Sequence, residues 1–323
     1  YRLAPAKDSL GLFLPMLTDL RRFRLAAKQL ARDSMEDSER HYYDSLQQVF
    51  KVLINSFYGY LGAVVHNFSD PVAAAEVTRL GRVTIRNMID LLASEGATPV
   101  EVDTDGIYFR PPATCESEEA EKALVQRISQ KLPEGIEVEL DGRYRSMFAY
   151  KTKNYALQGY DGRIVVKGSA LRSRGMEPYL REFLREIIER LLAGNAAMVE
   201  QLFDNYAARL RSRHLDVAWV ARSETLNESP DRYCEKLRDG KRNHSAAFEI
   251  ALASGRSYRA GDHVSYYVSG SVRDTTAYEQ CRPVAAFDPA HPDINALYYI
   301  EKLRHVKKRF EPFLPQEPTL FDL

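Results

Sequence analysis

The sequence predicts an α+β fold, on three observations. Two stretches near the start and two after residue 177 repeat apolar residues every three or four positions, as helices packed on one face do. Residues 100–110 alternate apolar and acidic side chains around a glycine, as two strands joined by a tight turn would. Residues 135–150 alternate like paired strands. Helices and strands thus occupy separate parts of the chain, which is the arrangement of an α+β protein.

The first two helices are predicted over residues 10–31 and 41–59, with the polar residues 32–40 as the tip of a hairpin. Each has an apolar stripe that would face a core. The stripes consist of Leu17, Leu20 and Ala27 in the first helix and of Leu46, Val49, Phe50, Leu53, Ile54 and Phe57 in the second.

Cationic side chains occupy other faces of these two helices. Arg24 and Lys28 lie four residues apart on another side of the first helix, and Lys51, Asn55 and Tyr58 share one face of the second. Cations from two antiparallel helices can converge on one polyanion, such as a nucleoside triphosphate with about four negative charges. The alternative is a pair of solvated helix faces. Asn55 and Tyr58 beside Lys51 weigh against that alternative.

The acidic hairpin is the most informative stretch of the chain. Strand periodicity predicts Val100 and Val102 on a buried face and Glu101, Asp103 and Asp105 on the other. Two aspartates one residue apart at a hairpin tip form an oxygen-only, doubly negative site that suits Mg²⁺. D-T-D-G is also a run of common turn residues, so the local sequence leaves a solvated turn as the alternative.

The other elements follow from the same patterns. The strand and turn pattern gives way to long helices near residues 174–178, which marks the clearest boundary. The predicted elements are helices at 70–94, 116–132 and 297–313, two helices within 178–214, and strands at 215–221 and 263–268.

The overall charge is balanced, with 45 basic and 45 acidic residues. A surface for a polyanion must therefore come from local segregation of charge. Residues 141–174 contain eight basic and two acidic residues and include the basic runs K-T-K-N-Y and K-G-S-A-L-R-S-R. We predict that these residues form a surface that binds a polyanion. The alternative is a charged hairpin that binds no ligand.

Cysteine usage and hydropathy restrict the class of protein. Cys115, Cys234 and Cys281 are far apart, which argues against a disulfide framework or a zinc site and for a reducing, intracellular location. We find no membrane-length apolar run and no leader sequence. The first residue is Tyr1 rather than Met, which hints at a fragment.

Four motifs occur in a fixed order along the chain. They are K-V-L-I-N-S-F-Y-G at residues 51–59, V-D-T-D-G at 102–106, K-T-K-N-Y at 151–155 and K-G-S-A-L-R-S-R at 167–174. Together they resemble motif B, motif C, the K-x-Y motif and the K-G-x-R-R region of family B DNA polymerases. One such motif is weak evidence, whereas four in order are strong evidence.

The resemblance implies a polymerase right-hand architecture and template-directed DNA synthesis. The implied parts are helical-hairpin fingers at 1–62, an antiparallel-sheet palm at 63–175, a mainly helical thumb at 176–315 and a flexible tail at 316–323. The implied substrates are primer-template DNA and deoxynucleoside triphosphates, and the implied cofactor is Mg²⁺, as two ions.

The roles of single residues follow from the same resemblance, position by position. The residues implied in catalysis and metal binding are Asp105 and its companion Asp103. Those implied to bind the incoming nucleotide are Arg24, Lys28, Lys51, Asn55 and Tyr58. Those implied to hold DNA are Lys151, Lys153, Tyr155, Lys167, Arg172 and Arg174.

One essential motif of the family is missing. Motif A, an aspartate followed by an S-L-Y-P-like run, has no match, and the similar string at residues 8–11 lies in the wrong context, just ahead of the first helix. A second metal carboxylate would therefore have to come from a missing N-terminal portion, in the same or a separate chain. The alternatives are a non-catalytic DNA-binding or scaffolding relative and, more weakly, a two-metal nuclease.

The C-terminal tail, Q-E-P-T-L-F-D-L, resembles short peptides that bind sliding clamps. Leu320 and Phe321 would be the apolar anchors of such a contact. The alternative is that this pair packs back on the thumb.

Overall fold

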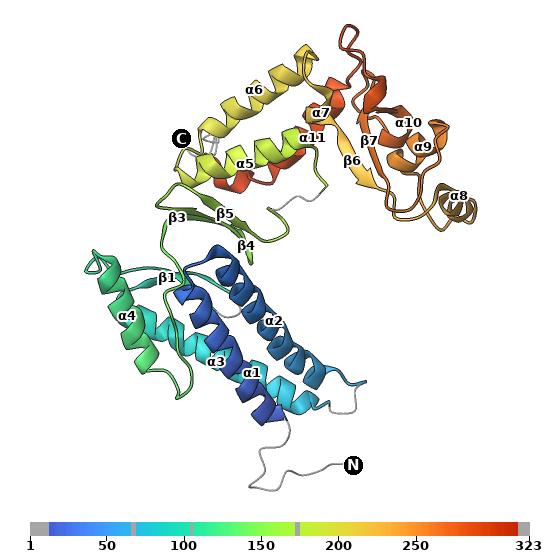
Figure 1. Cartoon of the computed structure of the whole chain (residues 1–323). Coiled ribbons are helices and arrows are strands. Elements are labelled where there is room, and N and C mark those ends of the chain that lie inside the picture. Colours follow the sequence, from blue (N-terminus) through green and yellow to red (C-terminus); the bar gives the residue numbers. More distant parts are fainter. Residues whose placement is uncertain (1–12, 66–68, 104–105, 172–174, 316–323) are drawn as a thin grey trace. The chain divides into compact units, whose positions relative to one another are not determined.

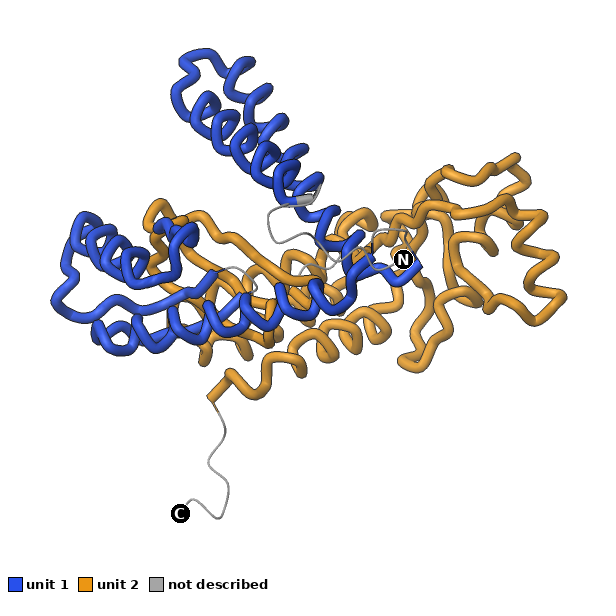
Figure 2. The backbone as a smooth tube through the Cα atoms, turned by 90° about the horizontal axis from the view of Figure 1, so that it is seen from below, with its two compact units in different colours: residues 1–140 blue, residues 141–323 orange. Residues whose placement is uncertain are grey.

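The computed structural model describes residues 13–65, 69–103, 106–171 and 175–315. Its helices and small antiparallel sheets confirm the α+β class. The chain divides into two compact units, which we describe separately: unit 1 comprises residues 1–140 and unit 2 residues 141–323 (Figure 2). In the described ranges, no helix has the length and apolar character needed to cross a membrane.

Unit 1 begins with a helical hairpin, followed by a third helix (Figure 1). The helices are α1 (Phe13–Asp33), α2 (Asp37–Gly62) and α3 (Pro71–Ser94). The α1 and α2 helices pack against each other, and the rings of Phe23 and Phe50 lie 5.9 Å apart. Asp70 caps α3, because its carboxylate accepts the backbone N–H groups of Val72 and Ala73 at 3.1 and 2.9 Å.

The predicted acidic hairpin is present as β1 (Thr98–Val102) and β2 (Ile107–Arg110), which pair antiparallel. The prediction for one of its faces is wrong. A bulge between Pro99 and Glu101 interrupts the alternation, so Val100 is 51% exposed and Glu101 is half-buried. The small core beneath the hairpin includes Leu92, Ala97, Leu124 and Ile128, the last two from α4 (Glu118–Gln130).

Unit 2 contains two three-stranded antiparallel sheets and several helices. The first sheet, in the order β3-β4-β5, packs with three helices around the main hydrophobic core. These elements are β3 (Tyr144–Lys151), β4 (Asn154–Gly159), β5 (Ile164–Lys167), α5 (Pro178–Leu192), α6 (Met198–Ser212) and α11 (Ala296–Lys308).

The second sheet, in the order β6-β7-β8, contributes to a smaller core that includes Leu226, Tyr233 and Phe248. Its strands are β6 (Arg222–Thr225), β7 (His263–Val268) and β8 (Cys281–Pro283). The remaining elements are α7 (Val217–Val220), α8 (Pro230–Arg238), α9 (Ala246–Ala253), α10 (Ala277–Gln280) and the 3₁₀ turns η1 (Val284–Ala286) and η2 (Glu311–Phe313).

Two further local predictions are wrong. The strand predicted at 215–221 is the short helix α7, because the Asp216 carboxylate accepts the Ala218 N–H at 2.9 Å and caps a helical turn. Residues 135–143 form no strand, and β3 pairs with β4 instead. A turn at Pro133, whose carbonyl accepts the Ile136 N–H at 3.1 Å, precedes that segment.

Candidate active site

The acidic hairpin of unit 1 holds Asp103 at its turn. Val102 pairs with Ile107, and the Asp103 N–H donates to the Gly106 carbonyl at 2.9 Å. Asp105, the predicted principal metal ligand, lies outside the described residues. Within the described part of the chain, no group of three or more His, Cys, Asp or Glu side chains could hold a metal ion. The carboxylates described here therefore do not complete a metal site.

The second helix presents the predicted nucleotide-binding face to solvent. Lys51, Asn55 and Tyr58 all lie on α2 and are exposed, with Tyr58 45% exposed. The predicted apolar stripe of α2 is only partly buried, because Val49 and Leu53 remain 54% and 42% exposed. The role of the exposed face stays a prediction.

The two cations on α1 lie on one face of the helix. Arg24 and Lys28 are both half-buried on the side of Leu17 and Leu20, so the prediction that they lie on another side of the helix is wrong. The buried Nε of Arg24 has no hydrogen-bond partner among the described residues. The Lys28 ammonium lies 3.2 Å from the Glu139 carboxylate, and this contact holds the pKa of Glu139 below its ordinary value.

The first sheet of unit 2 brings the predicted DNA-binding lysines together. Lys151 ends β3, Lys153 lies in the turn before β4, and Lys167 ends β5 opposite Tyr155. All three lysines are exposed at the same end of the sheet, whereas Tyr155 is only 3% exposed. The ring of Tyr155 is therefore not a surface for DNA in this structure, and its implied role stays a prediction. Arg172, Arg174, Leu320 and Phe321 lie outside the described residues.

Asn154 is a residue of this region that the sequence analysis missed. Its Oδ1 accepts the Ala170 N–H at 2.8 Å, and its Nδ2 donates to the Thr152 carbonyl at 2.9 Å. It therefore joins the β3–β4 turn to the loop after β5. The available signal was an asparagine beside a turn, since that side chain readily bonds to nearby backbone.

A basic cleft of about 510 Å³ in unit 2 was also missed. Arg222, Lys302, His305 and Arg309 line it, together with Glu177, whose side chain is 4% exposed and forms an ion pair with Lys302. Three of these residues lie on α11 or directly after it, whereas Glu177 and Arg222 are far from them in the sequence, so no local motif could have indicated the cleft.

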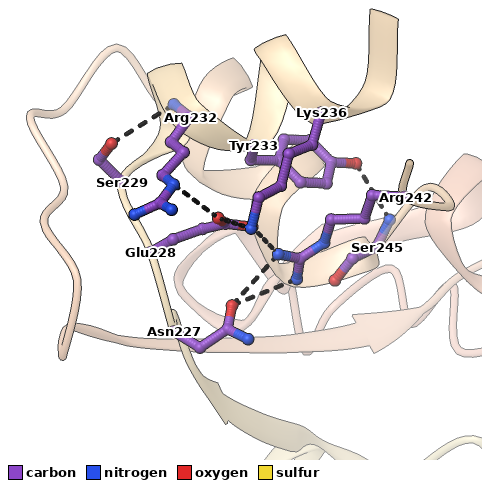
Figure 3. A network of polar contacts seen from close by, with 8 residues as sticks. All are labelled: Asn227, Glu228, Ser229, Arg232, Tyr233, Lys236, Arg242 and Ser245. Carbon is purple, nitrogen blue, oxygen red and sulfur yellow. Dashed lines mark hydrogen bonds and ion pairs between the residues drawn. The ribbon is translucent and has the colours of Figure 1, made fainter. Parts of the chain in front are cut away.

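A second polar cluster supports the smaller core of unit 2. Figure 3 shows the Glu228 carboxylate among Arg232, Lys236 and Arg242. The Glu228 side chain is 7% exposed, and the hydrogen bond from Lys236 at 2.5 Å holds the pKa of this carboxyl below its ordinary value. The Arg242 guanidinium also lies 4.5 Å from the centre of the Phe248 ring. This cluster ties α8 to the core rather than forming an open site.

Comparison with curated proteins finds archaeal DNA polymerases. DNA polymerase 1 of Pyrococcus abyssi is 28% identical over 298 residues, which are 91% of this chain and 38% of that protein. A DNA polymerase of Archaeoglobus fulgidus is 30% identical over 266 residues, which are 81% of this chain and 32% of that protein. The chain thus spans well under half the length of these relatives.

A solved structure and a family profile agree with these relatives. The family B DNA polymerase of the hyperthermophilic archaeon Pyrobaculum calidifontis has a similar fold, with a TM-score of 0.69 and 22% identity over 94% of this chain and 38% of that one. The profile of the family described as DNA polymerase family B matches residues 2–311. Since the profile covers nearly the whole sequence, this chain belongs to DNA polymerase family B.

Proposed function

We propose that this chain supplies the fingers (1–62), the later palm (63–175) and the thumb (176–315) of a template-directed DNA polymerase. The completed enzyme transfers a nucleotide from a deoxynucleoside triphosphate to a primer 3′-hydroxyl. The observation that carries the proposal is the order of the four motifs, from residue 51 to residue 174, within a chain that belongs to this family. The presence of Lys51, Asn55 and Asp105 favours a catalytic protein, because a relative that had lost its activity would be expected to lose these residues first.

The donor set of the acidic hairpin fits a hard divalent cation. Asp103 and Asp105 both carry a carboxylate and are separated by a single residue. Oxygen ligands of this kind suit Mg²⁺. These two residues would hold two Mg²⁺ ions together with a motif A aspartate from the missing portion. Bound Mg²⁺ would lower the pKa of the primer hydroxyl and neutralise charge that develops on the phosphates.

The fingers would bind and orient the triphosphate. Lys51 and Lys28 supply positive charge, and Asn55 and Tyr58 lie on the exposed face of α2 with Lys51. The ion pair between Lys28 and Glu139 is largely exposed, and such pairs contribute about 1 kcal/mol or less. A triphosphate can therefore displace Glu139 from Lys28. Positioning and charge stabilisation are the main contributions that phosphoryl-transfer enzymes make.

Primer extension with Mg²⁺ and all four nucleotides tests the proposal. The chain alone should not extend a primer, whereas the chain joined to or mixed with the upstream segment that carries motif A should. Asp105→Ala should reduce extension by about 10³-fold or more, because it removes an essential charged group. Asp204→Ala, which removes an exposed aspartate from α6, is the matched control and should leave extension unchanged.

Two results would contradict the proposal. If the completed protein binds primer-template but never extends it, the chain is part of a non-catalytic DNA-binding or scaffolding relative. If it degrades DNA in the absence of nucleotides and does not extend a primer, the site is that of a two-metal nuclease.

A further inference from the structure

The loop after β5 is held in place by two side chains from distant parts of unit 2. The Ala170 N–H donates to Oδ1 of Asn154 at 2.8 Å, and the Ala170 carbonyl accepts a hydrogen bond from Nη2 of Arg309. Leu171, the next residue, is 4% exposed and belongs to the main core. Both polar backbone groups of Ala170 are thus engaged, and the loop is anchored immediately after them.

The same loop approaches the β3–β4 turn very closely. Gly168 has φ = +88°, and a Cβ atom placed on it would lie 2.3 Å from both Oδ1 of Asn154 and the carbonyl oxygen of Lys153. Only glycine fits there without a shift of backbone. Lys153 itself has φ = +61°, an uncommon conformation for a residue with a side chain. The turn and the loop therefore interlock, with Asn154 between them.

Exposed lysines flank this interlock on both sides. Lys153 directly precedes Asn154, and Lys167 directly precedes Gly168. The spacing between the two lysines depends on the pairing of Lys167 opposite Tyr155 and on how Asn154 and Arg309 hold the loop that follows. Arg309 is itself fixed, because its guanidinium lies 5.7 Å from the centre of the Tyr150 ring. One N–H group of its guanidinium donates a hydrogen bond to the Ala170 carbonyl in the loop.

We propose that Asn154 and Arg309 are positioning residues that set Lys153 and Lys167 at a fixed spacing for the backbone phosphates of primer-template DNA. This inference rests on the proposed function. Phosphate contacts of this kind fix the register of a protein on a duplex without reading its sequence. The two groups that hold the loop are a neutral amide and an arginine that bonds to the backbone, so neither lysine takes part in these two hydrogen bonds.

The test is the salt dependence of binding, measured with the whole chain. Anisotropy of a fluorescent primer-template gives the dissociation constant at a series of KCl concentrations. Lys167→Ala should reduce the slope of log affinity against log salt by about 1, as the loss of one phosphate contact does. Asn154→Ala removes no charge, yet it should reduce the slope similarly and weaken binding about 5- to 10-fold.

Matched variants separate positioning from simple loss of charge or fold. Gln158→Ala removes a neutral amide from the same strand, where it bonds to Ser146 at 3.2 Å, and should leave binding unchanged. Arg309→Met should act like Asn154→Ala, and Arg309→Lys should recover part of the affinity. Arg304→Met removes an exposed arginine from α11 and serves as the charge control. The double variant Asn154→Ala/Lys167→Ala should bind little worse than either single variant.

The outcomes distinguish this inference from the proposed function. If neither the unsubstituted chain nor the completed protein binds primer-template, the proposed function fails and this inference fails with it. If the unsubstituted chain binds while Asn154→Ala and Arg309→Met leave affinity and slope unchanged, this inference alone is overturned. Additive losses in the double variant, with an unchanged slope in Asn154→Ala, would show a structural role only and would also overturn it.

Discussion

The two units differ in how far their apolar side chains are buried. Most large apolar side chains of the α1, α2 and α3 helices in unit 1 remain exposed, for example Val52 at 65%, Val72 at 79% and Leu80 at 50%. In unit 2 most apolar residues of α5 and α11 are buried, with Leu297 as an exposed exception at 47%. The buried apolar residues of unit 1, among those described, are Ala27, Ala74, Leu92, Ala97, Leu124, Val125 and Ile128.

The difference concerns where helix stability comes from. Most helical stability in proteins comes from packing of an apolar face. Unit 2 provides that packing and also forms hydrogen bonds within its core: the Tyr179 hydroxyl donates to the Tyr299 carbonyl at 3.0 Å, and the Tyr299 hydroxyl accepts the Val268 N–H at 2.8 Å. The helices of unit 1 show the same periodicity with much less burial. A helical pattern in sequence is therefore not evidence of a core within the same unit.

The largest effect is expected from truncating a core side chain in unit 2. Ile187 is 0% exposed on α5, so Ile187→Ala should cost about 2–5 kcal/mol of unfolding free energy. Leu53→Ala on α2, at 42% exposure, should change stability by about 0.5 kcal/mol or less. Urea unfolding, combined with hydrogen exchange of each unit, measures both. If both variants lost the same free energy of unfolding, Leu53 would have to be buried in solution. The difference in burial between the two units would then be wrong.

The next effect separates a buried ion pair from an exposed one. Lys302→Met would leave the Glu177 carboxylate, only 4% exposed, without its cation, and should cost about 3 kcal/mol or more. Lys28→Met removes the partner of Glu139 in unit 1, where both side chains are largely exposed, and should cost about 1 kcal/mol or less. Thermal unfolding of the two variants tests this order. A larger loss for Lys28→Met would contradict it.

The smallest effect is a dependence of stability on pH in unit 2. Because Lys236 lowers the pKa of Glu228 in the folded state, this carboxylate stabilises the fold fully above its unfolded pKa of 4.5. That stabilisation is lost as the pH falls through the lower folded pKa. The difference in Tm between the unsubstituted chain and Glu228→Gln should therefore be constant at neutral pH and shrink below pH 4.5.

Glu235→Gln provides the control for the pH measurement. Glu235 lies on the same helix, α8, and is exposed. Its replacement should give a Tm that follows the unsubstituted chain at every pH. A Glu228→Gln difference that grows on acidification would show that the cations around Glu228 do not stabilise its charged form.

Much of the local structure could be predicted because short-range rules decide it. The helices of both units and the acidic hairpin follow from periodicity, caps and turn residues, as Asp70 at the start of α3 illustrates. The errors occurred where a neighbour overrides the pattern. The bulge at Val100 reversed one strand face, and the Asp216 cap turned a β-branched segment into a helix.

The candidate site was predictable only in part. The sequence assigned Lys151, Lys153 and Lys167 to one basic region, and the register of β3, β4 and β5 brings them to one end of the sheet. It could not indicate that Tyr155, in the same motif, is buried, because burial depends on the elements that cover a strand. The place of Arg24 in the stripe of α1, by contrast, follows from the three- and four-residue spacing of Leu17, Leu20, Arg24 and Ala27 and could have been predicted.

The sequence by itself determined the family, the order of the motifs and the types of most elements, because these depend on residues close together in the chain. Only the tertiary structure decided which side chains hold those motifs in place. Asn154 and Arg309 lie 155 positions apart by their numbers, yet both bond to Ala170. Hydrogen bonds between such distant residues depend on the packing of α11 within unit 2, and no local periodicity encodes that packing.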